Sequence, residues 1–216
     1  MKLVRKLRDR RWRDKLGLFV VEGEDLVEAA TAAGIDPADR LSADVDVSAE
    51  LLAEASTLAH PPRVVAVFRR DDLPAGRRSV TLALWHVVDP GNVGTLLRSA
   101  DAFGAGIALS SGCADPTSRK ELRASMGAVF RVPLVGFDDP TGRRIALVPR
   151  CGTPLPELQL SGEAVLVLGA EREGLPDAVL AACDARATIP QAGGESLNVA
   201  MAGTVALYEL ARRSPS

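Results

Sequence analysis

The stretch that decides the fold is Ser79–Gly106, with the sequence SVTLALWHVVDPGNVGTLLRSADAFGAG. Residues Val80–Val88 are β-branched, aromatic and aliphatic, as in a buried strand, and Asp89–Asn92 is turn sequence that cannot continue it. Across Val93–Gly104 the apolar residues recur at helical spacing, and the segment ends in the glycine typical of a helix C-terminus. The stretch therefore predicts a strand, a glycine turn and a helix, which is the unit of an α/β fold.

The same pattern of strand, glycine loop and helix returns twice further along the chain. The apolar run Ala164–Leu168 leads into the loop Gly169–Gly174, and the short strand Ala187–Ile189 leads into the loop Pro190–Glu195. A long helix over Leu197–Arg212 follows, for which Ser196 is the predicted N-cap. Because ligands of open α/β sheets bind beyond the carboxyl ends of the strands, the three loops could converge on one ligand. The chain contains neither a dinucleotide fingerprint nor a phosphate loop.

The N-terminal third reads as a separate, smaller α/β unit. Short apolar strands alternate there with helical segments, among them a helix over Ser48–Ala59 that begins at a serine N-cap. A polar segment with proline and glycine follows, as is typical of a linker. We therefore predict a small domain over residues 1–72, a linker over 73–78 and a larger domain over 79–216.

Composition limits the class of protein. The chain has 216 residues, of which 47% are hydrophobic, so that it can bury a sizeable core. Its apolar runs fall short of the roughly 20 residues that cross a bilayer, and its N-terminus is charged, so we expect a cytoplasmic location and no membrane. The three cysteines are odd in number and have no metal-binding spacing, which predicts buried free thiols rather than a disulfide framework or a structural zinc site. The two histidines, His60 and His86, are too far apart in sequence and context to be candidates for an acid or a base, and both are read as structural.

Charge is unevenly distributed, although the net charge is only −2. Residues 1–16 carry eight basic side chains against Asp9 and Asp14, a local excess of six. This segment predicts an amphipathic basic helix. Such a cluster suits a polyanion held at one place on the surface, while a solvated helix end is the simpler alternative.

Taken together, the three loops resemble the sequence motifs of the SpoU (TrmH-like) family of RNA ribose 2′-O-methyltransferases, of the SPOUT class. The first motif is similar to Asp89–Gly94 with Leu97–Gly104, the second to Leu166–Glu171 with Glu173–Leu175, and the third to Ile189–Pro190 with Ser196–Val199. Residues Arg123–Gly127 are similar to the intervening family segment, and Phe19–Gly23 to the small RNA-binding domain that precedes the catalytic domain in many members.

The resemblance implies a parallel sheet with a deep trefoil knot near the C-terminus, which sequence patterns alone would not predict. It also implies S-adenosylmethionine as the cofactor, an RNA substrate and a homodimer. Ribosomal RNA is favoured over transfer RNA, because the N-terminal domain resembles a module that binds ribosomal RNA. The small residues of the last helix, Ala200, Ala202, Gly203 and Ala206, permit close backbone approach and suggest a dimer face there.

Individual roles follow from the matched motif positions. Arg98 is the first candidate for a catalytic residue: its guanidinium would stabilise the developing alkoxide of the ribose and hold the adjacent phosphate. The other candidates for the catalytic site are Asn92, Glu171, Ser196 and Asn198. The candidates for cofactor binding are Gly169, Ile189, Leu197 and, again, Ser196.

Simpler interpretations stay open at this stage. Arg98 could be a surface residue paired with Asp101, Glu171 could cap backbone amides, and Ser196 could be no more than an N-cap. Transfer RNA is the second candidate substrate. Because the loop Gln191–Glu195 is one residue shorter than is usual in the family, a non-catalytic RNA-binding or assembly protein is a further alternative. A small-molecule enzyme is disfavoured by the missing phosphate loop.

Overall fold

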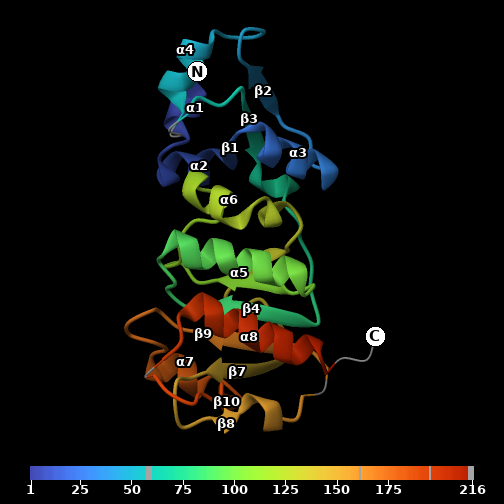
Figure 1. The fold of residues 1–216 in the computed structure, drawn as a ribbon, viewed down its shortest axis with the longest axis vertical. Coiled ribbons are helices and arrows are strands. Elements are labelled where there is room, and N and C mark those ends of the chain that lie inside the picture. The colour runs from blue at the N-terminus through green and yellow to red at the C-terminus, as the bar shows by residue number, and fades with distance from the viewer. Residues whose placement is uncertain (57–59, 161, 195, 214–216) are drawn as a thin grey trace. The chain divides into compact units, whose positions relative to one another are not determined.

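The chain packs as two compact units in the computed structural model, which describes residues 1–56, 60–160, 162–194 and 196–213 (Figure 1). The first unit comprises Met1–Pro74 together with Asp115–Arg131, and the second comprises Ala75–Ala114 together with Val132–Ser216. No pattern in the sequence predicts that Asp115–Arg131 packs with the N-terminal residues. Asp115–Arg131 thus packs in the first unit, although it lies within residues 79–216, which the sequence assigns to the larger domain.

A three-stranded antiparallel sheet with the order β1-β3-β2 forms the centre of the first unit. Its strands are β1 (Leu18–Glu22), β2 (Asp39–Ser42) and β3 (Val64–Arg69). Its helices are α1 (Lys2–Lys6), α2 (Arg10–Leu16), α3 (Glu24–Ala32), α4 (Ala49–Ala55), α6 (Arg119–Ser125) and the short 3-10 helices Arg70–Asp72 and Ala128–Phe130. Three stacked or tilted phenylalanine rings, Phe19, Phe68 and Phe130, fill its core and tie the late segment to the sheet.

The N-terminal basic segment differs from the single amphipathic helix that its pattern predicts. It forms two helices: the first ends at Lys6 with Leu7 as its C-cap, and Asp9 starts the second by accepting a hydrogen bond from the backbone N–H of Arg11. Ser48 caps α4, as predicted, by accepting from the N–H of Leu51. The helix ends at Ala55, and residues 57–59 of its predicted span lie outside the described residues.

A buried ionic cluster holds the late segment in the first unit. The Oδ2 atom of Asp115 accepts hydrogen bonds of 2.9 Å from Arg13 Nε and from Arg70 Nη2. Its Oδ1 atom accepts from the backbone N–H and the hydroxyl of Thr117, at 2.9 and 2.7 Å. Arg13, which the sequence counts among the surface cations, is thus 5% exposed and neutralised inside the unit.

Glu121 of α6 is a buried carboxylate with an unsatisfied oxygen, and Glu121→Gln should stabilise the protein at pH 7. Its side chain is buried, and Oε2 has no hydrogen-bond partner among the described residues. Burial, with the charge of Asp115, raises its pKa. A raised carboxyl pKa favours folding below the unfolded value of about 4.3, and this contribution is lost as pH rises.

Thermal unfolding from pH 4 to pH 8 measures this effect. The midpoint of Glu121→Gln should exceed that of the wild type at neutral pH, and the difference should shrink toward pH 4. The control is Glu50→Gln on α4, where the carboxyl pKa is lowered by a backbone hydrogen bond and by Ser48, so that no gain is expected. A Glu121→Gln protein less stable than the wild type at pH 7 would contradict the interpretation.

The second unit is built on a seven-stranded parallel sheet with the order β6-β5-β4-β9-β7-β10-β8. This arrangement confirms the predicted α/β class. The strands are β4 (Val80–Leu84), β5 (Gly106–Leu109), β6 (Leu134–Gly136), β7 (Arg143–Leu147), β8 (Thr153–Pro154), β9 (Ala164–Leu168) and β10 (Ala185–Thr188). The helices are α5 (Pro90–Ala102), α7 (Asp177–Ala181), α8 (Val199–Ala211) and the 3-10 helix Leu155–Glu157. The predicted knot stays a prediction.

Alternate side chains of the central strands face opposite sides of this sheet. Leu82 and Leu168 face α8, where Gly203 leaves room for Leu96 of α5, so α5 and α8 lie side by side (Figure 1). Ala83 and Val167 pack on the other side, in the cluster that contains Val179 of α7.

Two element boundaries differ from their predictions in the first motif. Strand β4 ends at Leu84 rather than at residue 88, and α5 begins at Pro90 rather than at residue 93. Asp89 is the N-cap and accepts from the N–H of Asn92, and Pro90 is suited to the first helical turn because that turn needs no intrahelical N–H donor. The apparent turn sequence is therefore the start of the helix.

None of the helices in the described ranges is both long and apolar enough to cross a lipid bilayer. Over the same residues, no three histidine, cysteine or acidic side chains are grouped as they would be to hold a metal ion.

Candidate active site

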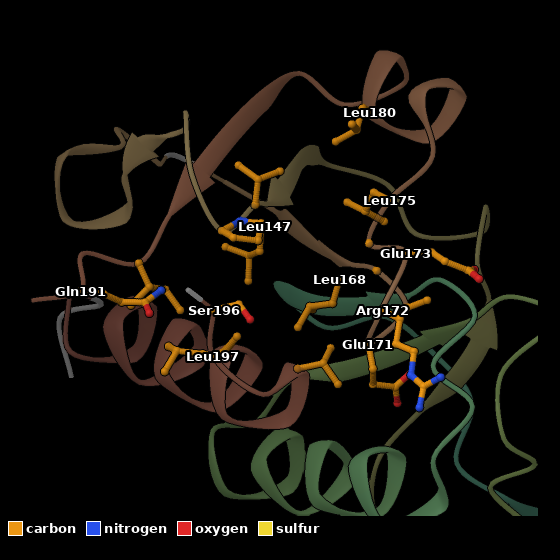
Figure 2. A pocket seen from close by; sticks show the side chains of 18 residues that line it. Leu147, Leu168, Glu171, Arg172, Glu173, Leu175, Leu180, Gln191, Ser196 and Leu197 are labelled. Carbon is orange, nitrogen blue, oxygen red and sulfur yellow. The ribbon is translucent and has the colours of Figure 1, made fainter. Parts of the chain in front are cut away.

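The loops that follow β9 and β10 enclose a pocket of about 420 Å³ at the carboxyl edge of the parallel sheet. Figure 2 shows Gln191, Ser196 and Leu197 on one side of it, Glu171 and Arg172 on the other, and Leu168 between them. The predicted cofactor residues Gly169, Ile189, Leu197 and Ser196 all line this pocket. Residues far apart in the second and third motifs are thus brought together, as expected for a ligand site.

The first motif joins the other two through side-chain hydrogen bonds at Asn92. Its amide nitrogen donates to Glu171 Oε1 at 2.9 Å, and its amide oxygen accepts from Asn198 Nδ2 at 3.0 Å. Glu171 Oε1 also accepts from the backbone N–H of Asp89 at 3.3 Å. Glu171 therefore binds the first motif as well as lining the pocket. The side chains of Asn92, Glu171 and Asn198 therefore form one hydrogen-bonded network, to which each of the three motifs contributes one side chain.

Gly169 is required for the shape of the second loop. Ala170 and Gly174 exchange two backbone hydrogen bonds of 3.1 and 3.0 Å across this loop, which closes it on itself. A Cβ atom on Gly169 would collide with the backbone of Gly174 and Leu175, where nothing can move aside without opening the loop. The glycine therefore allows the loop to close beside the pocket.

Arg98 and Ser196 are placed differently from the other predicted residues. Arg98 is exposed on α5 and does not line the pocket, and its guanidinium has no hydrogen-bond or ion-pair partner within the described part of the chain. Ser196 lines the pocket but is not the N-cap of α8, because that position belongs to Asn198. The predicted N-cap was wrong by two residues. Glu195 of the preceding loop lies outside the described residues.

Sequence reasoning missed several residues of the pocket wall. Leu147, Val148 and Pro149 line it from the end of β7, and Arg172, Leu175 and Leu180 line it from the segment after β9. Leu147, Val148 and Pro149 could have been identified from their position at the carboxyl end of a predicted strand, since residues there lie at the ligand-binding edge of a parallel sheet. Leu175 belongs to the second motif but was not named as a site residue, and Leu180 of α7 carries no comparable signal.

Replacing Asn198 with alanine should remove the side-chain hydrogen bond between the third motif and the first, together with the N-cap of α8. The Asn198 Oδ1 atom caps α8 by accepting from the N–H groups of Ala200 and Met201, at 2.9 and 3.2 Å. Loss of an N-cap costs about 1 kcal/mol, and Asn92 would lose a partner as well. We expect Asn198→Ala to lower the free energy of unfolding by about that amount in urea titration. Asn198→Asp retains the N-cap acceptor but not the donor to Asn92, so it should recover the part of the stability that the cap contributes; equal loss in both variants would contradict this capping role.

Comparison with known proteins identifies the family. Residues 79–208 match the model of the SpoU rRNA methylase family, and residues 1–67 match that of the MRM3-like substrate binding domain. The chain is 35% identical to a Synechocystis protein described as a tRNA/rRNA methyltransferase, over 99% of this chain and 90% of the relative. It is 29% identical to the 23S rRNA (guanosine(2553)-2′-O)-methyltransferase RlmP of Bacillus subtilis, over 95% of this chain and 93% of that protein.

The structure agrees with these relationships. The AdoMet-bound rRNA methyltransferase of Sinorhizobium meliloti superposes with a TM-score of 0.87 at 30% identity, covering 100% of this chain and 95% of that one. The match of family model, relatives and fold over almost the whole length leaves one assignment. The chain belongs to the SpoU rRNA methylase family.

Proposed function

We propose that this protein is an S-adenosylmethionine-dependent methyltransferase that methylates a ribose 2′-hydroxyl in ribosomal RNA. The observation that carries the proposal is the network of Asn92, Glu171 and Asn198, which ties three separated motifs together beside one pocket. Family membership and the AdoMet-bound relative support the same activity. A cytoplasmic location fits an enzyme that acts on ribosomal RNA.

The pocket fits the proposed cofactor in size and in lining. Its volume of about 420 Å³ lies within the range of about 300–1,000 Å³ that is usual for small-molecule sites. Leu168, Ile189 and Leu197 offer apolar contacts to an adenosine, and the backbone at Gly169 is unobstructed by a side chain. S-adenosylmethionine supplies an electrophilic methyl group on its sulfonium. The chain's own residues have to hold the two substrates in line, and the proton of the hydroxyl is lost to solvent water, because none of the assigned residues acts as its base.

Arg98 is the residue that we assign to the ribose. A guanidinium keeps its proton at neutral pH, so it acts by stabilising the developing alkoxide and by binding the adjacent phosphate rather than as a base. Its exposure and its lack of a partner among the described residues leave all of its donors available to RNA. Asn92 and Glu171 hold the start of α5, the helix that carries Arg98, in place.

Ribosomal RNA is the proposed substrate, because the relative from Bacillus subtilis is named for 23S rRNA and the chain contains the substrate-binding domain. In our assignment residues 1–72 bind substrate RNA, 73–78 are a linker and 79–216 carry the catalytic domain. Exposed cations remain on α1 and α2 after the internal pairs are formed, and the ammonium of Lys6 lies 4.1 Å from the centroid of the Trp12 ring. A cationic surface with an aromatic ring suits unpaired RNA.

The experiment that tests this function has two parts. Calorimetric titration with S-adenosylmethionine measures cofactor binding, and mass spectrometry maps ribose methylation in ribosomal and transfer RNA incubated with the protein and cofactor. Methylation of ribosomal RNA is expected. Methylation confined to transfer RNA would show that the substrate is transfer RNA. Absence of cofactor binding would show that the protein is a non-catalytic RNA-binding protein.

A homodimer is also part of the proposal, with α8 as the contacting face. Gly203 and Ala206 of this helix are buried within their own chain, whereas Met201, Val205 and Tyr208 are 64%, 42% and 57% exposed. These larger apolar residues recur at helical spacing and form one uncovered stripe. The stripe, rather than the small residues named from the sequence, is therefore the proposed dimer face.

Placing a charge in this stripe should produce a monomer. We expect Val205→Glu to shift the sedimentation coefficient from that of a dimer to that of a monomer, because a carboxylate cannot be buried unpaired in an apolar contact. Thr95→Glu on α5 places the same charge at an exposed position of the second unit and should leave the dimer intact. A monomeric wild type would reject the dimer.

A further inference from the structure

The loop between β4 and α5 carries an exposed histidine in an unusual conformation. His86 has a φ angle of +52°, in the left-handed region that side-chain-bearing residues seldom adopt. Such a conformation persists where the surrounding structure enforces it, and it is common beside ligands. The residue is exposed, so the conformation does not serve to bury the ring in the core.

The imidazole ring is clamped between two neighbours in the fold, Trp85 and Gly112. Trp85 stacks on one face, with a centroid distance of 4.8 Å and an interplanar angle of 15°. Gly112 also packs against the ring. A Cβ atom added to this glycine would lie 2.7 to 2.9 Å from three atoms of the ring, Cγ, Cδ2 and Cε1. Because that position is nearly equidistant from atoms around the ring, the glycine lies over a face. The edge with the two nitrogens is what remains for a ligand.

The backbone around the histidine is fixed without any help from its side chain. The N–H of His86 donates to Ser110 Oγ at 2.9 Å, and the N–H of Ala114 donates to Val87 O at 2.9 Å. These bonds join the loop after β4 to the loop after β5. The imidazole itself has no hydrogen-bond partner among the described residues. A purely structural role in joining these loops would therefore not involve the two ring nitrogens of His86.

The position of the loop links the histidine to the proposed reaction. Strand β4 lies between β5 and β9, and its carboxyl end faces the same edge as the end of β9, where the pocket is. Asp89, three residues after the histidine, donates its N–H to Glu171 Oε1 at 3.3 Å. The loop that holds His86 is therefore bonded directly to a residue of the pocket wall.

We propose that His86 contacts the substrate RNA through the edge of its ring, by a hydrogen bond to a nucleobase close to the methylated ribose. A neutral imidazole offers one donor and one acceptor, which suits the edge of an unpaired base. Clamping by Trp85 and Gly112 fixes the direction of this edge before RNA binds, which lowers the entropic cost of the contact. The sequence alone had suggested a structural role for this histidine. The proposal rests on the proposed function, since it names a contact of the same substrate.

Kinetics of methyl transfer from S-adenosylmethionine to a ribosomal RNA transcript test this contact. His86→Asn keeps a residue that tolerates the left-handed conformation but removes the ring. We expect the KM for RNA to rise about tenfold, the effect of losing about 1.4 kcal/mol of binding, with kcat and the cofactor Kd within about twofold. Gly112→Ala, which displaces the ring while keeping it, should raise the KM in the same direction. Gln159→Asn, at an exposed position near the amino ends of β4 and β9, is the control and should leave the KM and kcat unchanged.

Each other outcome overturns the proposal. An unchanged KM in His86→Asn shows that the ring does not touch RNA, and a joint change of kcat, cofactor Kd and thermal midpoint shows a structural role. A KM that rises with a smaller dependence on salt shows a phosphate contact instead of a base contact. If the wild type binds the cofactor but methylates no RNA, the proposed function fails. The contact of His86 is still tested in that case, by comparing the Kd of the same labelled transcript for the wild type and for His86→Asn.

Discussion

Arg98→Lys is expected to lower kcat for ribose methylation by about 100-fold or more while leaving the Kd for S-adenosylmethionine unchanged, because loss of one preorganised donor to a developing oxyanion costs that much. Lysine keeps the charge, but it loses the planar fork of donors that can bind an alkoxide and a phosphate together. Arg98 is exposed on α5 and does not line the pocket, so its replacement should not affect the cofactor.

Steady-state kinetics on ribosomal RNA, cofactor calorimetry and thermal unfolding of the same preparation measure the three parts of this prediction. The matched control is Arg186→Lys on β10, an exposed arginine of the same unit outside the pocket lining, for which kcat should stay within about twofold. Near-normal turnover of Arg98→Lys would remove the arginine from the reaction. It would leave the pocket and the network of Asn92, Glu171 and Asn198 as the basis of the function.

How far the sequence predicts this site depends on which interactions are local. The spacing of strand, loop and helix was enough to expect that Asn92, Gly169 and Ile189 begin segments that meet, because parallel strands present their carboxyl ends at one edge. Boundaries inside the motifs were less predictable. Pro90 and Ser196 are both compatible with a turn, an N-cap or a first helical position, and only the path of the flanking chain selects among these.

Interactions between distant residues had no signal in the sequence at all. Arg13 reads as one more cation of a basic helix, and Asp115 as a loop residue that follows a strand. Their separation of 102 residues leaves no periodicity or motif that could pair them. The clamp on His86 has the same origin, since Trp85 is its neighbour in sequence but Gly112 belongs to the next loop. Tertiary packing, rather than local preference, fixes these contacts.

Asp115→Asn should lower the free energy of unfolding by about 3 to 5 kcal/mol, because removing one partner of a buried ion pair leaves the other charge uncompensated. The charge left behind is that of Arg13, whose side chain is 6% exposed and whose Nη2 lies 2.8 Å from Asp115 Oδ2. Asparagine matches aspartate in size, so packing is kept and the loss reports the charge. Urea unfolding at pH 7 measures it.

The pH dependence of this loss identifies its cause. Burial by itself raises the pKa of Asp115, but the hydrogen bonds from Thr117 and the charges of Arg70 and Arg13 outweigh it and leave the pKa below its usual value. A lowered carboxyl pKa gives stability that is present above the unfolded value of about 3.9 and is lost as pH falls through the folded value. The gap between wild type and Asp115→Asn should therefore narrow in acid.

Asp14→Asn provides the matched comparison, since its carboxylate binds the same Arg70 at 2.7 Å but is half exposed. An exposed pair contributes no more than about 1 kcal/mol, so this variant should stay within that range of the wild type. Equal losses for Asp14 and Asp115 would mean that burial is irrelevant to the cluster. A loss in Asp115→Asn that stayed constant down to pH 3 would mean that packing, and not the ionised carboxylate, holds residues 115–131 in the first unit.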